Sequence, residues 1–203
     1  MFWVIDIAFI GAHIIFTAMG LRVPLLNIEV DGSYPEFFQY IKWFWLSYLS
    51  LVLSVRRKQK SFIFLAVIFL ILLIQDSFRI HESYGSQIAA NLNMEPVLGL
   101  RLQDYGEAVV MLVTGAISLS LWMLSYRFVS LEQRYIVAVT GRLLLLVGAF
   151  SVVADMLHEM MTRVGRLAYV SMGVIEDGGE MLLLSILVGL FVVYGLSGVR
   201  TAR

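Results

Sequence analysis

The chain has 203 residues, of which 60% are hydrophobic and only 15% are charged, and its mean hydropathy is +0.84. A soluble globular domain carries about 25% charged residues, so water is not expected to be the main solvent of this protein. The formal net charge is zero, which gives no argument for a nucleic-acid partner, and the lack of cysteine excludes disulfides, thiolate metal ligands, iron–sulfur clusters and cysteine nucleophiles.

Six apolar runs have the length needed to cross a membrane, which is roughly 20 residues at about 1.5 Å rise per residue. They cover residues 2–21, 37–55, 61–81, 104–126, 135–158 and 178–197. Turn-forming or charged segments separate them, among them Asp31-Gly32, the basic run 56–60, and Pro96 with Gly99. The pattern predicts one all-α membrane domain over residues 1–203, without a separate soluble domain. The first run lacks the basic start of a cleavable signal peptide and is expected to be a retained helix.

Basic residues in the short loops indicate the orientation of these runs. The loops after the second and fourth runs and the C-terminal tail hold Arg56, Arg57, Lys58, Lys60, Arg127, Arg134, Arg200 and Arg203. With six spans they all fall on one side, which predicts a plasma (inner) membrane protein with both termini cytoplasmic. The same topology leaves six basic and thirteen acidic residues in the outer half. The orientation does not account for this excess of acidic residues, because Asp and Glu contribute little to the positive-inside rule.

Most of these acids are expected at helix ends, in a pattern that occurs twice. The first copy is His81-Glu82 followed by Asp104-x-Gly-Glu107, and the second is His158-Glu159 followed by Asp177-x-Gly-Glu180. The repetition predicts that the third and fourth runs and the fifth and sixth runs are two copies of one hairpin, related by parallel pseudo-symmetry.

The pattern predicts a metal site near the outer membrane face. The candidate ligands are Asp155, His158, Glu159, Asp177, Glu180, Asp104, Glu107, His81 and Glu82. Residues three and four apart share a helix face, so Asp155, His158 and Glu159 are expected to point together. In the other copy Arg79 follows Asp76 at that spacing, which predicts an ion-paired ladder with Glu82 and makes the second hairpin the better candidate. Carboxylates with one or two imidazoles suit Fe, Mn or Zn.

Two physical arguments bear on this cluster. Converging carboxylates in a low dielectric must share protons, pair with arginine or hold a cation. The competing explanation is structural, because Asp104 and Asp177 in the first turn of a helix would be ordinary N-caps. The glycines beside the acids, Gly106, Gly178 and Gly179, would allow neighbouring helices to approach closely or leave room for an ion.

Three ionisable residues of the first two runs need partners of their own. Asp6 and His13 lie seven residues apart and share a helix face. They form either a proton or ion path, with His13 as an extra ligand, or a buried histidine hydrogen-bonded to a neighbouring helix. Lys42 is expected to extend its ammonium group to the outer interface.

Three classes of function remain open. The first is a membrane metal protein, which includes a metal-dependent enzyme that activates oxygen or water. The second is a proton- or cation-coupled transporter or channel. The third is a non-catalytic sensor or a subunit of a larger membrane complex. Expected partners are the lipid bilayer, a metal ion and homo- or hetero-oligomeric membrane partners.

One part of the pattern is similar to the four-helix carboxylate-bridged di-iron proteins. The likeness consists of Asp155-x-x-His158 and the doubled hairpin. Arg79 stands where a second histidine would be needed, and the acids are expected at helix ends instead of helix centres. We therefore infer no membership of that family.

Overall fold

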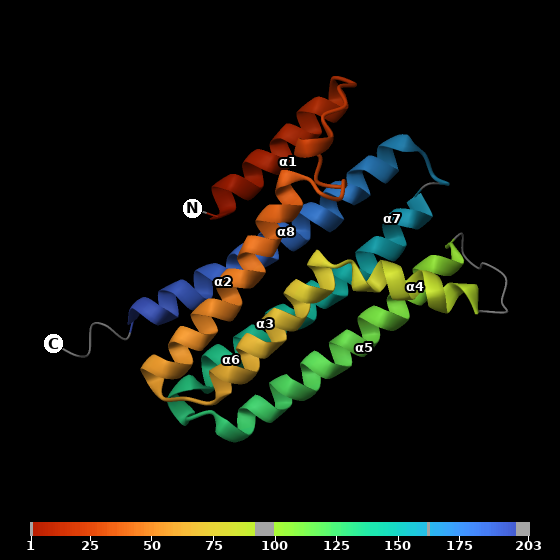
Figure 1. Cartoon of the computed structure of the whole chain (residues 1–203). Helices are drawn as coiled ribbons and strands as arrows, with labels where there is room; N and C mark the ends of the chain where they lie inside the picture. Colours follow the sequence, from red (N-terminus) through yellow and green to blue (C-terminus); the bar gives the residue numbers. More distant parts are fainter. Residues whose placement is uncertain (1, 92–99, 162, 198–203) are drawn as a thin grey trace.

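A computed structural model describes residues 2–91, 100–161 and 163–197, and over these residues the chain forms helices and no strand. The α-helices are α1 (Phe2–Ala18), α2 (Tyr34–Arg57), α3 (Ser61–Ser77), α4 (Ile80–Ala90), α5 (Leu102–Ser125), α6 (Arg134–Ala149), α7 (Asp155–Met161) and α8 (Arg166–Ser197). A π-helical segment, Phe150–Ala154, joins α6 to α7. The long helices form one bundle with roughly parallel axes, and neighbours such as α2 and α3 run in opposite chain directions; α1 lies against α8 (Figure 1). The predicted all-α fold is confirmed.

Three helical segments are long and apolar enough to cross a membrane, namely Leu102–Phe128, Leu131–Met161 and Arg166–Ser197. The pair α3 and α4 is bent by 65° and adds a fourth if it is one broken span. The apolar helix α1 is shorter, with 17 residues. These three to four candidate spans within the described residues indicate an integral membrane protein. The Pro96 and Gly99 break and the C-terminal arginines lie outside the described residues.

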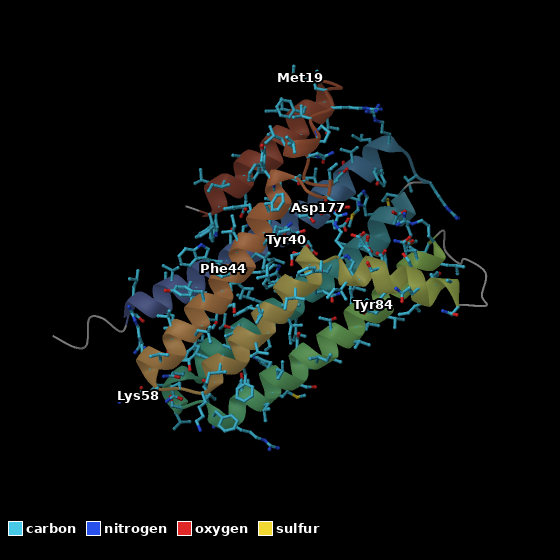
Figure 2. The ribbon with its side chains drawn as sticks, in the orientation of Figure 1. Met19, Tyr40, Phe44, Lys58, Tyr84 and Asp177 are labelled. Carbon is cyan, nitrogen blue, oxygen red and sulfur yellow. The ribbon has the colours of Figure 1, made fainter. Side chains whose placement is uncertain are left out.

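Capping explains where α2 begins and ends. The Ser33 hydroxyl accepts a hydrogen bond from the Glu36 amide at 3.4 Å, and Pro35 stands in the first turn, both of which favour a helix start. Lys58 ends the helix with a left-handed φ of 52°. A short turn then leads into α3, which packs along α2. Figure 2 shows Lys58 at this end of the bundle and Met19 near the other.

Polar side chains of α2 face inward, while its large apolar side chains face outward. Gln39, Lys42 and Ser50 are buried, whereas Phe44 and Trp45 are 56% and 41% exposed. This is the reverse of a helix at the surface of a soluble protein. The inward polar residues lower the hydropathy of α2, which explains why it is not among the candidate spans although it has 24 residues.

Lys42 lies inside the bundle, so the prediction that it reaches the outer interface is wrong. Its side chain is fully buried, and Nζ donates hydrogen bonds to Asp6 Oδ1 at 2.5 Å and to the Met181 carbonyl at 2.8 Å. Ser185 Oγ donates to the other Asp6 oxygen at 2.5 Å. The opposite charge on α1 and the acceptor on α8 hold the ammonium group more favourably than the interface would.

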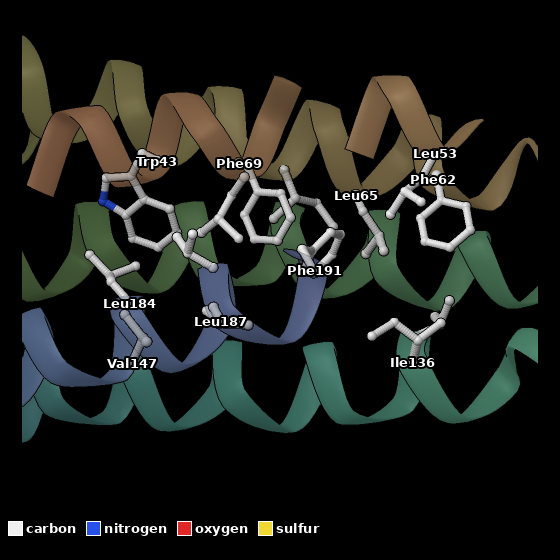
Figure 3. Packing of buried hydrophobic residues seen from close by; sticks show 14 residues of the cluster. Trp43, Leu53, Phe62, Leu65, Phe69, Ile136, Val147, Leu184, Leu187 and Phe191 are labelled. Atoms are coloured by element: carbon white, nitrogen blue, oxygen red, sulfur yellow. The ribbon is translucent and has the colours of Figure 1, made fainter. Parts of the chain in front are cut away.

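An apolar core joins α2, α3, α6 and α8. The Phe69 ring lies 6.2 Å from the Trp43 ring and 5.5 Å from the Phe191 ring, measured between centroids. Figure 3 shows these rings with Leu184 and Leu187 from α8. In a bilayer such packing stabilises the bundle mainly through dispersion and close fit, because lipid tails are as apolar as the core.

Two predicted helix boundaries are wrong, and both errors move site residues. The helix predicted over 61–81 ends at Ser77, and Arg79 takes a left-handed φ of 48° before α4 starts in a new direction. His81 and Glu82 therefore begin α4. The helix predicted to start at 178 starts at Arg166, so Asp177 lies well inside α8 and is not an N-cap.

Glycines bring helices close together, as predicted. A Cβ at Gly106 would overlap the carbonyl oxygen of Gly85, so α5 and α4 cross backbone to backbone. Gly178 and Gly179 face side chains of α1 and of the π-helical segment. A larger residue at Gly106 would force α4 and α5 apart.

Candidate functional site: an acid-lined cavity

A cavity of about 890 Å³ is lined by residues of all the α-helices from α2 to α8, together with the loop before α2. Its walls carry ten acidic side chains, namely Glu29, Asp31, Glu36, Asp76, Glu82, Glu107, Asp155, Glu176, Asp177 and Glu180. They also carry two arginines and two histidines, namely Arg79, Arg101, His81 and His158. The acid excess seen in the sequence therefore surrounds one internal space. Seven of the nine predicted ligands line it, and Asp104 and Glu159 do not.

The α7–α8 wall holds the second predicted hairpin. His158 Nδ1 lies 2.7 Å from Glu176 Oε2, and the His158 ring centroid lies 4.1 Å from that of Tyr169. Ser151 Oγ donates a hydrogen bond to Glu180 Oε1 at 2.5 Å. Asp155 and Asp177 line the same space. Figure 2 shows Asp177 away from both ends of α8.

Glu29 reaches this wall from the loop before α2. A Cβ at Gly173 would overlap Glu29 Oε1 and would lie 3.0 Å from His158 Cε1. This glycine therefore lets the Glu29 carboxylate and the His158 ring meet. Glu29 Oε1 also lies 3.7 Å from His13 Nε2. Over the described part of the chain, Glu29 Oε1, His13 Nε2 and His158 Nε2 are buried without a hydrogen-bond partner.

Arg101 holds the two predicted ligands that lie off the cavity. Its guanidinium group contacts Asp104 at 2.8 Å and Glu159 at 2.9 Å. Asp104 also accepts from the Arg101 amide at 2.6 Å, which completes a capping box at the start of α5. The hydrogen bond to Asp104 raises the pKa of Arg101 above its usual value. Asp104 thus takes part in the capping of α5 from the third position of the helix, with Arg101 as the N-cap residue, which supports the structural explanation.

The predicted ladder of Asp76, Arg79 and Glu82 is wrong. The left-handed backbone at Arg79 turns its side chain toward Asp31, which it contacts at 3.1 Å. Both partners are exposed to a large extent, at 40% and 57%. Asp76 remains on the cavity wall, where no lysine or arginine of the described residues forms an ion pair with it.

The other end of the cavity is apolar. Its walls there are Leu112, Gly115, Ala116, Leu119, Leu144, Leu145 and Gly148. Trp122 packs against Gly141, where a Cβ would overlap the indole ring, and its Nε1 donates to the Val137 carbonyl at 2.8 Å. The cavity therefore has an acidic end near α7 and an apolar end that stops at Trp122.

No metal centre is apparent. Among residues 2–91, 100–161 and 163–197, no three His, Asp or Glu side chains form a group that could hold a metal ion. The histidines of the two predicted copies also differ in surroundings, since His81 stands 3.9 Å from Glu82 of its own helix and His158 pairs across to α8.

Five of the ten wall acids are not among the predicted ligands, namely Glu29, Asp31, Glu36, Asp76 and Glu176. Glu176 adjoins the predicted Asp177 and was passed over because a helix start was expected there. Glu29 and Glu36 lie in the acidic loop segment between the first two runs. Glu29 meets His158 because that loop folds over α8, whereas Glu36 lines the cavity from the first turn of α2. Local sequence patterns do not reveal either position.

Neither the curated proteins nor the solved structures include a match to this chain. A family model matches residues 30–194, which take in α2 to α7 and nearly all of α8. That range includes all the acidic wall residues except Glu29. The chain belongs to the family described as Domain of unknown function (DUF8692).

Proposed function

We propose that this chain is an integral membrane protein that binds a cation in its acid-lined cavity. The observation that carries the proposal is the imbalance of ten carboxyl groups against two arginines on the cavity walls. Buried carboxylates repel one another unless protons, basic side chains or a bound cation balance them. The requirement applies above all to α7 and α8, which contribute four of the ten acids, Asp155, Glu176, Asp177 and Glu180.

The two arginines do not balance these inner acids. Arg101 contacts Asp104 and Glu159, and Arg79 contacts the exposed Asp31. Over the described part of the chain, no lysine or arginine forms an ion pair with Asp155, Glu176, Asp177 or Glu180. A cation in the cavity would balance part of this charge.

The proposal includes six spans: α1, α2, α3 with α4, α5, α6 with α7, and α8. The inward polar and outward apolar faces of α1 and α2 support the first two, because lipid favours that arrangement. Asp6 and His13 of α1 are buried, for example, while Val4 and Ile15 are exposed. Six spans put the basic loops and both termini on the cytoplasmic side of the plasma membrane and the acidic end of the cavity outside.

A transition metal, Fe, Mn or Zn, is one candidate for the cation. The free Nε2 of His158 favours it, since imidazole nitrogen suits these metals. Asp155, Asp177, Glu180, Glu107, His81 and Glu82 would then be its other possible ligands from the predicted set. The absence of a ready-made ligand group over the described residues means that binding would have to draw several of these side chains together.

Transport is a second candidate. The acidic cavity would be its outer half, and Trp122 against Gly141 would be the closed inner gate. A cation-flux assay in liposomes tests this candidate. Faster cation uptake by the Trp122→Ala variant than by wild type would support it. Leak of an uncharged solute through the same variant would contradict a cation pathway.

Thermal unfolding with a panel of cations tests the proposed binding. Protein in lipid nanodiscs is titrated with Mn²⁺, Fe²⁺, Zn²⁺ and alkylammonium ions, and its metal content is measured. A cation at about 100 times its Kd is expected to add about 2.7 kcal/mol to the free energy of unfolding. The double variant Asp177→Asn/Glu180→Gln should lose this gain, whereas Glu132→Gln, an exposed acid outside the cavity, should keep it. Wild type that no cation stabilises contradicts the proposal.

A further inference from the structure

We propose that the cation is an organic ammonium ion with an apolar tail, whose head lies among the acids and whose tail lies between α5 and α6. This inference rests on the proposed cation binding and names the class of ligand. It is carried by three features of the cavity: the acceptors at its acidic end, the shape of its apolar end, and its position against the lipid.

The acidic end offers acceptors for a donor group. His158 is 9% exposed, and its Nδ1 is held by Glu176 at 2.7 Å. When Nδ1–H donates to Glu176, Nε2 carries a lone pair and accepts. Nε2 and the nearby Glu29 Oε1 have no hydrogen-bond partner among the described residues, and Glu29 Oε1 lies 3.7 Å from His13 Nε2. An ammonium group has only donors and a positive charge, so it satisfies both atoms, whereas a hydroxyl or a carboxylate head would not.

The apolar end gives the ligand a tail. Leu112 to Trp122 along α5 is a wall of about 15 Å at about 1.5 Å per residue. Gly115 and Gly148 face this space from opposite sides, and a Cβ on either would meet no other atom within 4 Å. A bare inorganic ion would fill only a small part of this volume. The cavity of about 890 Å³ falls instead within the range of about 300–1,000 Å³ typical of small-molecule sites.

The same walls face the bilayer. Leu112 and Leu145 line the cavity and are also 64% and 57% exposed. The apolar end is therefore open sideways, toward lipid tails, while Trp122 on Gly141 closes it below. A molecule with a cationic head and an apolar tail orients in a bilayer with its head at the interface. Its cationic head would then face the acidic end of this cavity, and its apolar tail would face the apolar end.

Isothermal titration of nanodiscs with four probes tests this ligand class, after subtraction of partitioning into empty nanodiscs. The probes are n-octylammonium, n-butylammonium, 1-octanol and octanoate. We expect n-octylammonium to bind, n-butylammonium to bind more weakly, and the uncharged and anionic probes not to bind. Glu176→Gln, which frees the His158 ring, should weaken n-octylammonium about tenfold, equal to about 1.4 kcal/mol.

The tail is tested by filling its space. Gly148→Leu should weaken n-octylammonium about tenfold, because the burial of about two methylene groups of its tail is lost, and should leave n-butylammonium nearly unchanged. Gly189→Leu is the matched control, since this glycine of α8 also faces open space but lies off the cavity. Equal binding of 1-octanol, or equal effects of the two glycine variants, would overturn the inference. If Mn²⁺ or Zn²⁺ binds and no ammonium probe does, the cation site stands and this ligand class is wrong. If no cation binds, both proposals fall.

Discussion

Two groups of buried ionisable side chains lie in this bundle, and they differ in how their charges are balanced. Asp6 and Lys42 form a 2.5 Å ion pair whose remaining atoms are bonded to Ser185 and to a backbone carbonyl. Among the described residues, no lysine or arginine forms an ion pair with the cavity acids Asp155, Glu176, Asp177 and Glu180, and His158 Nε2 has no hydrogen-bond partner. The Asp6–Lys42 pair, with its hydrogen bonds to Ser185 and to the Met181 carbonyl, connects α1, α2 and α8. The acids around the cavity surround an open space, and their excess negative charge favours a bound cation. Burial of charge alone therefore does not mark a candidate site; buried polar atoms without a hydrogen-bond partner are the more specific sign.

The largest effect is expected from breaking the Asp6–Lys42 pair. Lys42→Met leaves the Asp6 carboxylate buried without its counter-charge and should lower the free energy of unfolding by about 3–5 kcal/mol. Unfolding by SDS in mixed micelles measures it. The double variant Asp6→Asn/Lys42→Met removes both charges and should recover most of the loss. A single variant as stable as wild type would show that the pair does not hold the helices.

The hydroxyl that completes this pair should matter less. Ser185→Ala removes a hydrogen bond to a buried carboxylate and is expected to cost about 1.5–3 kcal/mol in the same assay. Ser120→Ala is the control, because Ser120 is exposed and bonds only to the Ala116 carbonyl of its own helix. Equal losses for the two serines would argue against a special role for the buried network.

The cavity should respond with the opposite sign. Asp177→Asn removes one of several mutually repelling groups and is expected to raise the free energy of unfolding by about 1 kcal/mol when no cation is added. The gain from added cation should shrink at the same time. Glu132→Gln, off the cavity, should change neither value. A loss of stability in Asp177→Asn without cation would mean that this carboxylate is already balanced.

The smallest effect is expected at Arg101. It contacts Asp104 and Glu159, yet its side chain is 61% exposed, so solvent screens both pairs. Arg101→Gln should lower the free energy of unfolding by less than about 1 kcal/mol. The difference between variant and wild type should fall further as salt is raised. If the loss of unfolding free energy persisted at high salt, the ion pairs of Arg101 would behave like the buried Asp6–Lys42 pair and not like exposed ion pairs.

The fold was more predictable than the site. Hydropathy located the helices because a membrane-spanning segment consists of about 20 mainly apolar residues. Five of the six predicted runs begin within three residues of the start of a helix in the structure. The start of α8 was missed because the acid pair Glu176–Asp177 interrupts the apolar pattern and is itself typical of a helix start. The bend at Arg79 was missed because a left-handed arginine has no sequence signature. Whether the two hairpins are a true repeat stays a prediction.

What the sequence determined by itself is the membrane character of the chain and the gathering of its acids toward one end. The membrane character and the position of the acids both follow from the local composition of the chain, because composition decides whether a segment is more stable in lipid or in water. Only the tertiary structure decided which acids face the cavity. Asp104 caps a helix, Glu29 reaches His158 past Gly173, and Lys42 finds Asp6 on another helix. Such pairings depend on which helices pack together, and residues far apart in the chain carry no local sign of them.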